Sequence, residues 1–154
     1  DLADHNGETK QVIGDVIQSL TEINSILTQA QLQVGYRVRD EIVLFVLHAR
    51  EISSAFVTRG GETVDPLDLA FLMKVLPRIA GGSNAIRQVI LQLLGWTYRG
   101  QEFRTEEEAS PVTELWESAG RRGSLPGARF PRTAARLCLM WDRLQSEGFT
   151  SFWL

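Results

Sequence analysis

The chain has 154 residues, of which 44% are hydrophobic and 23% are charged, and this composition suits one globular domain with its own core. The net charge of -3 excludes binding to nucleic acid through overall positive charge, so such contact would require a local basic patch. The single cysteine, Cys138, excludes an internal disulfide and indicates a reducing compartment. No apolar run approaches the roughly 18 residues that span a bilayer, so we expect a cytoplasmic protein without a membrane partner.

Two helices are predicted in the first part of the chain. From Val12 to Leu27, apolar residues recur every three or four positions, which is typical of one face of a helix. After Gly35 a second stripe runs from Val38 to Phe56, and further apolar residues between positions 43 and 47 fill its other faces. A helix that is apolar nearly all round is usually buried, so we expect this one to be central. The glycines in Arg59 to Glu62 are predicted to follow its end.

Local signals mark the next two helices. Asp65 is a predicted N-cap, Pro66 suits the first helical position, and Asp68 lies in the first turn near the positive end of the helix dipole. Pro77 is expected to end or kink this helix. Ser83 is predicted to cap a further helix whose apolar stripe begins at Ile86.

Residues 99–130 are predicted to be a loop-rich insertion or connection. Residues 99–110 are charged and aperiodic, Pro111 is expected to open a short helix ending at Ser118, and a glycine-rich loop follows. The last helix is predicted from Pro131 to Gln145, with Gly148 past its end. The apolar residues of the tail after Gly148 are expected to dock on the core.

Together these patterns predict an all-α bundle of about five to six helices that forms a single domain over residues 1–154. The buried side of the last helix is expected to include Cys138 as an inert thiol. His48 is interpreted as a packed or boundary residue, because neither it nor His5 has partners at metal-ligand spacing. Glu106 to Glu108 are interpreted as a solvated run. The chain contains no phosphate-binding P-loop and no serine nucleophile elbow, so we expect no catalytic residue and no metal site in it.

The segment "GYR", Gly35, Tyr36 and Arg37, is the first candidate site. It precedes a predicted helix, and a helix start offers free backbone N–H groups and a positive dipole end to an anion. Arg37 is therefore a candidate phosphate-binding residue. The alternative interpretation is a surface arginine that pairs with Asp40 or Glu41.

An arginine row on the last helix is the second candidate. At about 100° per residue, Arg132, Arg136 and Arg143 fall within about 40° of one another on the side opposite the core. Arg121, Arg122 and Arg129 precede them. Such a row could contact DNA phosphates or a partner protein, whereas exposed helix faces usually carry these charges for solubility.

Three segments in order, "INSILTQAQLQVGYRVRDEI", "DLAFLMKVLPRIAGG" and "FPRTAARLCLMWDRLQSEGFTSFW", resemble the C-terminal lid of AAA+ NTPases of the McrB type. These are the motor subunits of modification-dependent restriction systems and their relatives. The resemblance covers roughly residues 12–82 and 130–153.

The resemblance implies a specific role for the start of the second helix. In AAA+ proteins an arginine at the start of a lid helix, the sensor 2 position, reaches the terminal phosphates of the nucleotide. Arg37 matches that position, Gly35 and Tyr36 shape the approach, and Arg39 is the competing candidate.

The resemblance also implies a larger parent protein. The Walker motifs, sensor 1 and the arginine finger are missing here, so the chain would be a fragment that does not hydrolyse nucleotide alone. The parent would bind ATP or GTP with Mg²⁺. The implied partners are an upstream α/β AAA+ subdomain, neighbouring subunits of a hexameric ring, a nuclease subunit, and DNA bound through other domains.

Two other functions stay open at this point. One is a free-standing helical DNA-binding or adaptor module that uses the arginine row, and the other is a structural bundle without a ligand.

Overall fold

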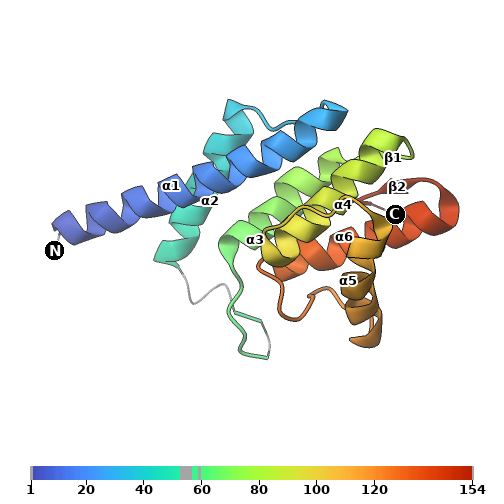
Figure 1. The fold of residues 1–154 in the computed structure, drawn as a ribbon. Helices are drawn as coiled ribbons and strands as arrows, with labels where there is room; N and C mark the ends of the chain where they lie inside the picture. The colour runs from blue at the N-terminus through green and yellow to red at the C-terminus, as the bar shows by residue number, and fades with distance from the viewer. Residues whose placement is uncertain (1, 53–56, 59, 154) are drawn as a thin grey trace.

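The computed structural model describes residues 2–52, 57–58 and 60–153, with side chains described from residue 6 onward (Figure 1). Six α-helices make up most of the described chain. Their bounds are α1 Leu2–Leu27, α2 Tyr36–Glu51, α3 Pro66–Ala70, α4 Asn84–Arg99, α5 Glu106–Ser118 and α6 Pro131–Glu147. Short 3-10 turns cover Thr28–Ala30 (η1) and Leu76–Arg78 (η4), and a π-helix covers Phe71–Val75 (η3). The prediction of an all-α bundle of five to six helices is confirmed.

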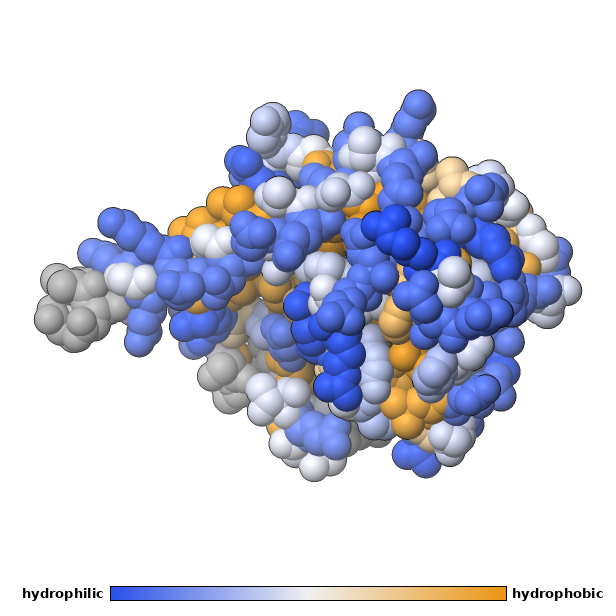
Figure 2. All heavy atoms as spheres, viewed as in Figure 1, coloured by the Kyte–Doolittle hydropathy of each residue, from blue (hydrophilic) through white to orange (hydrophobic). Residues whose placement is uncertain are grey.

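Helix α1 packs against α2 through the predicted apolar stripe (Figure 1). Val16, Leu20, Ile23 and Ile26 are each at most 2% exposed. The helix begins at Leu2, ten positions before the apolar pattern starts at Val12, because a helix can continue past its packed region into solvent when no proline or cap stops it. Hydrophilic side chains cover most of the face in Figure 2, with apolar atoms showing between them over α1 and α2.

The prediction that the second helix is central was wrong. In α2 the buried residues are Ile42, Val46 and Ala49, while Leu44 is 67% exposed. Helix α2 ends at Glu51 with Ile52 as its C-cap, so the prediction that the glycines in Arg59 to Glu62 follow its end was wrong. Phe56 and Arg59 themselves lie outside the described residues.

The central helix is α4, which contacts α1, α5 and α6 and buries ten of its residues. Apolar composition alone could not separate the two helices, because burial depends on how many neighbours pack around each one.

The predicted caps around α3 and α4 are confirmed. The Asp65 side chain accepts a hydrogen bond from the backbone N–H of Leu67 at 2.9 Å, and Pro66 opens α3. The chain passes through the π-helix η3 and leaves helical geometry after η4, which contains Pro77. The Ser83 hydroxyl accepts from the N–H of Ile86 at 3.2 Å at the start of α4.

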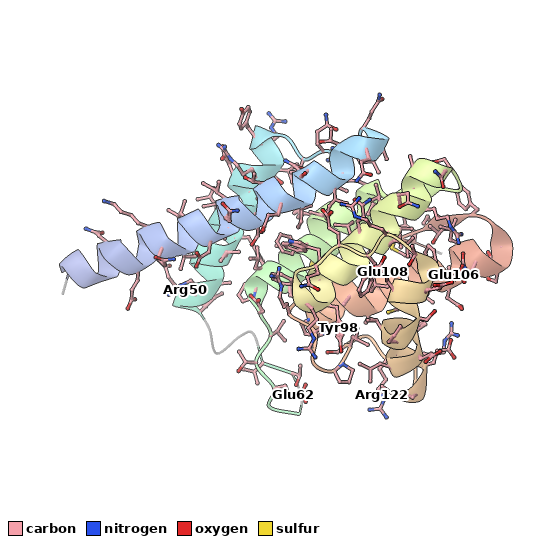
Figure 3. The ribbon with its side chains drawn as sticks, viewed as in Figure 1. Arg50, Glu62, Tyr98, Glu106, Glu108 and Arg122 are labelled. Carbon is pink, nitrogen blue, oxygen red and sulfur yellow. The ribbon has the colours of Figure 1, made fainter. Side chains whose placement is uncertain are left out.

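The expectation of an irregular connection over residues 99–110 needs correction, because α5 begins at Glu106. Thr105 caps it by accepting from the N–H of Glu108 at 3.2 Å, and the Glu108 carboxylate accepts in return from the N–H of Arg104 at 3.3 Å. The three glutamates therefore occupy the first turn, where the helix dipole favours negative charge (Figure 3 labels Glu106 and Glu108). This arrangement is a capping-box variant, and Pro111, which was predicted to open the helix, lies inside it.

Helix α6 runs from Pro131 to Glu147. Its C-cap is Gly148, whose φ of 76° lies in the left-handed region that favours glycine. It packs along α4 (Figure 1). Between them, the rings of Phe71, Trp96 and Phe130 form one aromatic cluster with centroid distances of 5.1 to 5.8 Å.

A buried carboxylate fixes the start of α6. Asp68, on α3, is 1% exposed, and its two carboxylate oxygens accept from the backbone N–H groups of Arg132 at 2.8 Å and Thr133 at 2.9 Å. The Thr133 hydroxyl donates to the Asp68 carbonyl at 2.9 Å. The sequence assigned Asp68 to the dipole of its own helix, whereas the structure uses it to cap α6.

The tail forms a two-residue strand, β2 (Thr150–Ser151), which pairs antiparallel with β1 (Ala80–Gly81). Thr150 is buried and Phe152 is partly buried, but Phe149 is 48% and Trp153 is 76% exposed. Among the described large apolar residues of the tail, the prediction that they dock on the core therefore holds only for Phe152. Successive side chains of a strand point to opposite faces, so alternate tail residues turn outward.

Candidate phosphate-binding site at the start of α2

Helix α2 begins without a side-chain cap. Gly35 occupies the N-cap position in an extended conformation (φ -84°, ψ 179°), and it has no side chain that could accept from the first-turn N–H groups. The first turn also contains no acidic residue. The start of α2 therefore combines open backbone donors with the positive end of the helix dipole, which favours an anion.

Arg37 lies in this first turn and is exposed. Within the described part of the chain its side chain has no hydrogen bond or ion pair. The two acids that were its alternative partners pair with other residues: Asp40 with Arg39 at 3.1 Å, and Glu41 with Lys74 at 3.6 Å. The Arg37 guanidinium is therefore available to an external anion.

Tyr36 and Arg39, which flank Arg37 in the sequence, contact each other. The Arg39 guanidinium stacks over the Tyr36 ring, 4.7 Å from its centroid, while it also pairs with Asp40. Both residues, with Gly35, line a hollow of about 260 Å³ between α1 and α2, whereas Arg37 is not among its lining residues. Because Arg39 is already paired and stacked, it is less free than Arg37 to reach a ligand.

The segment before α2 is held by two side chains that sequence reasoning missed. The Asn24 amide donates to the carbonyl of Val34 at 2.9 Å and accepts from its N–H at 2.6 Å, which links the segment to α1. The Arg78 guanidinium donates to the carbonyls of Leu32 at 3.2 Å and Gln33 at 3.1 Å, which links it to η4. No local sequence motif predicts either contact, because the bonded residues are 10 to 46 positions apart in the chain.

Residues 1–149 match the family described as "Domain of unknown function (DUF8727)". The chain belongs to this family. No curated protein and no solved structure matches the chain.

The arginine row of this DUF8727 chain is divided by the structure. Arg132 and Arg136 line a second hollow, beside α6, together with Arg121 and Arg122. Arg143 does not line this hollow. One terminal nitrogen of Arg143 is buried and has no hydrogen-bond partner among the described residues. Arg136 donates to the carbonyl of Phe152 at 2.9 Å and stacks on its ring.

Arg129 stacks on Trp96 and Phe130, with its guanidinium 4.8 and 5.2 Å from their ring centroids. The six arginines of the expected DNA-contacting surface therefore do not form one free row.

The remaining titratable candidates have structural roles. Cys138 is buried as predicted, and burial raises the pKa of its thiol to about 12. His48 is exposed on α2, so its interpretation as a packed or boundary residue was wrong. Among the described residues there is no group of three or more His, Cys, Asp or Glu that could hold a metal ion. The same residues include no helix with the length and apolar character needed to cross a bilayer.

Proposed function

We propose that this chain is the helical lid of an AAA+ nucleoside triphosphatase of the McrB type. In this proposal Arg37 is a sensor 2 arginine that binds the terminal phosphates of ATP or GTP held with Mg²⁺ by an upstream α/β subdomain. The observation that carries the proposal is the exposed, unpaired Arg37 in the first turn of α2, a helix start that has no side-chain cap.

The charges around Arg37 support this role. Arg39 and Lys74 pair with Asp40 and Glu41, the two carboxylates that follow Arg37 in the sequence. Arg37 keeps its full set of guanidinium donors, which match phosphate oxygens in a bidentate arrangement. In a closed site such a group stabilises negative charge that develops on the transferred phosphoryl group.

The contacts behind α2 support a coupling role. Asn24 binds the segment before α2 to α1, and Arg78 binds the same segment to η4. A displacement of Arg37 on hydrolysis would therefore move α1, α2 and η4 together as one body. Rigid-body motion of this kind is how a lid passes a change at the nucleotide to the neighbouring subunits of a ring.

The proposal includes the partners that the resemblance implies. The lid would act within a hexameric ring, next to an α/β subdomain and a nuclease subunit, and the ring would reach DNA through other domains. The chain alone would hydrolyse no nucleotide, since it lacks the P-loop that cradles the phosphates.

The deciding experiment measures NTP hydrolysis by the longer parent protein, with ATP and GTP tested separately and with DNA present or absent. Arg37→Ala is expected to lower kcat by about 10²-fold or more, within the range for removal of one preorganised charge-stabilising donor. The matched control is Arg50→Ala, which removes an exposed arginine from the far end of the same helix (Figure 3). Turnover by Arg37→Ala equal to that of the control with both nucleotides would refute the role of Arg37.

Arg39→Ala separates the two arginines of the first turn. We expect a smaller effect than for Arg37→Ala, because the Arg39 guanidinium is already stacked and paired. The reverse order would transfer the sensor role to Arg39 while leaving the lid assignment in place.

A further inference from the structure

Four arginines surround one hollow on the side of the molecule formed by α6 and the end of α5. The hollow has a volume of about 230 Å³, and its rim carries Arg121, Arg122, Arg132 and Arg136. The apolar part of its lining, called the floor below, includes Leu72 and Leu139. Among the described residues no carboxylate lines it. This concentration of positive charge is local, since the whole chain has a net charge of -3.

The four guanidinium groups differ in their freedom. Arg121 is held by Glu117 at 3.0 Å and Asp142 at 2.9 Å, outside the hollow. Arg136 uses one terminal nitrogen on the carbonyl of Phe152.

The side chains of Arg122 and Arg132 have no hydrogen bond or ion pair within the described part of the chain. Figure 3 shows Arg122 projecting outward at the end of α5. Two free guanidinium groups therefore stand on a rim where two others are fixed in place.

We propose that this hollow binds neighbouring phosphate groups of a nucleic-acid backbone. Guanidinium forks bind phosphate oxygens in pairs, and an apolar floor lowers the local dielectric constant, which strengthens such contacts. Arg132 and Arg136 are one helical turn apart, about 6 Å along the axis, while one DNA strand carries a phosphate about every 3.4 Å of its axis. Arginines on this rim can thus contact more than one phosphate of the same strand.

The arrangement indicates binding without sequence specificity. Reading of a base requires a side chain that enters a groove and meets a base edge, whereas these arginines surround a shallow hollow. Contacts confined to phosphates give modest affinity that falls steeply with salt concentration. The expected ligand is therefore any nucleic-acid strand.

This inference does not rest on the proposed nucleotide role. Arg37 lies at the start of α2, and Arg122 follows α5 on the opposite side of the molecule (Figures 1 and 3). The two sites share no residue, so failure of one leaves the other standing. The surface also differs from the six arginines predicted from the sequence, because Arg129 and Arg143 do not line the hollow.

The test measures binding of the 154-residue chain to a fluorescent mixed-sequence duplex and a single strand by anisotropy, over a series of salt concentrations. The variant Arg122→Gln/Arg132→Gln is expected to bind at least 10-fold more weakly at low salt. Its slope of log K against log salt should fall in magnitude by about 2, because each lost phosphate contact removes about 0.9 from a duplex slope. Replacement of the Arg132 side chain leaves its backbone N–H, so the cap by Asp68 is kept.

The control variant Arg50→Gln/Arg104→Gln removes the same net charge from exposed positions outside the hollow. It is expected to bind both probes as the wild type does. Equal weakening of the two double variants would overturn the site, because only total charge would then matter. Absence of binding by the wild type at low salt would also overturn it.

A competition experiment tests the class of ligand. A polyglutamate peptide of equal charge is expected to displace the duplex poorly. If the peptide binds more tightly than the duplex and with the same dependence on Arg122 and Arg132, the ligand is an acidic protein segment and the nucleic-acid assignment is wrong. Urea unfolding of each variant confirms that the compared proteins are folded.

Discussion

The buried carboxylate of Asp68 should dominate the stability of the α3–α6 junction, and Asp68→Asn tests this. The carboxylate accepts from two backbone N–H groups of α6, and both bonds are shorter than 3.0 Å. Asparagine has the same shape but only one oxygen, so its amide NH₂ would face one of these two N–H donors. One charge-assisted bond is lost, and the donor left behind stays away from water.

The magnitude follows from the two affected groups. A hydrogen bond to a charged group contributes about 1.5–3 kcal/mol, and a buried unsatisfied donor costs about 1–3 kcal/mol. These terms overlap, so we expect Asp68→Asn to lower the free energy of unfolding by about 2–4 kcal/mol. For a domain of this size, that corresponds to a fall in Tm of about 5–15 °C.

The assay is urea unfolding followed by tryptophan fluorescence and circular dichroism. The matched control is Asp65→Asn, three positions earlier, where an exposed N-cap accepts one hydrogen bond from Leu67. Asparagine caps helices about as well as aspartate, so the control should change stability by less than about 0.5 kcal/mol. If Asp68 acts only through the dipole of α3, its replacement should cost at most about 1 kcal/mol. A loss that small, or one equal to that of the control, would refute the capping role.

Three further substitutions or probes test other parts of the fold. Gly95→Ala should destabilise the protein by more than about 3 kcal/mol in urea unfolding, because a Cβ there would overlap the backbone carbonyl of Gln101. The control Gly14→Ala lies on an exposed turn of α1 with open space around it and should stabilise the protein by about 0.5–1 kcal/mol. The reverse order of stabilities would contradict the packing of α4. The Cys138 thiol should react with a thiol reagent at pH 8 only at the rate of unfolding. Because its pKa is raised from 9.0 to about 12 in the fold, its contribution to stability is complete below pH 9 and is lost between pH 9 and 12; fast labelling of the native protein would show that the thiol is accessible. Asn24→Ala removes both hydrogen bonds to Val34 and should cost about 1–3 kcal/mol, with faster hydrogen exchange before α2; unchanged exchange would show that this segment is held by other contacts.

The candidate site could be located from the sequence but not completed from it. The position of Arg37 at a helix start follows from the glycine and the apolar stripe that surround it. Its lack of a carboxylate partner could not be predicted, because Arg39 and Lys74 compete for the same acids and only their positions in space decide the pairing. Asn24 and Arg78 gave no signal for the same reason, since each acts on residues far along the chain.

The arginine row shows the same limit. A helical wheel places Arg132, Arg136 and Arg143 on one side of α6, and it does so correctly for a single helix. The wheel does not include the tail strand or the loop after α5. Phe152 from the tail ties down Arg136, while the loop brings Arg122 to the hollow. The tail and the loop after α5, which a helical wheel omits, therefore determine which arginines stay free of partners within the chain.

The sequence by itself determined the class of fold and the places where several helices begin or end. Caps at Asp65 and Ser83, and the glycine end of α6, are interactions within about four residues, so the local residue order contains all the partners they need. The tertiary structure alone decided that α4 is central and that Asp68, besides lying in the first turn of α3, caps α6. Burial and long-range hydrogen bonds depend on which elements meet in space, and residue order constrains those encounters only through the packing of the whole chain.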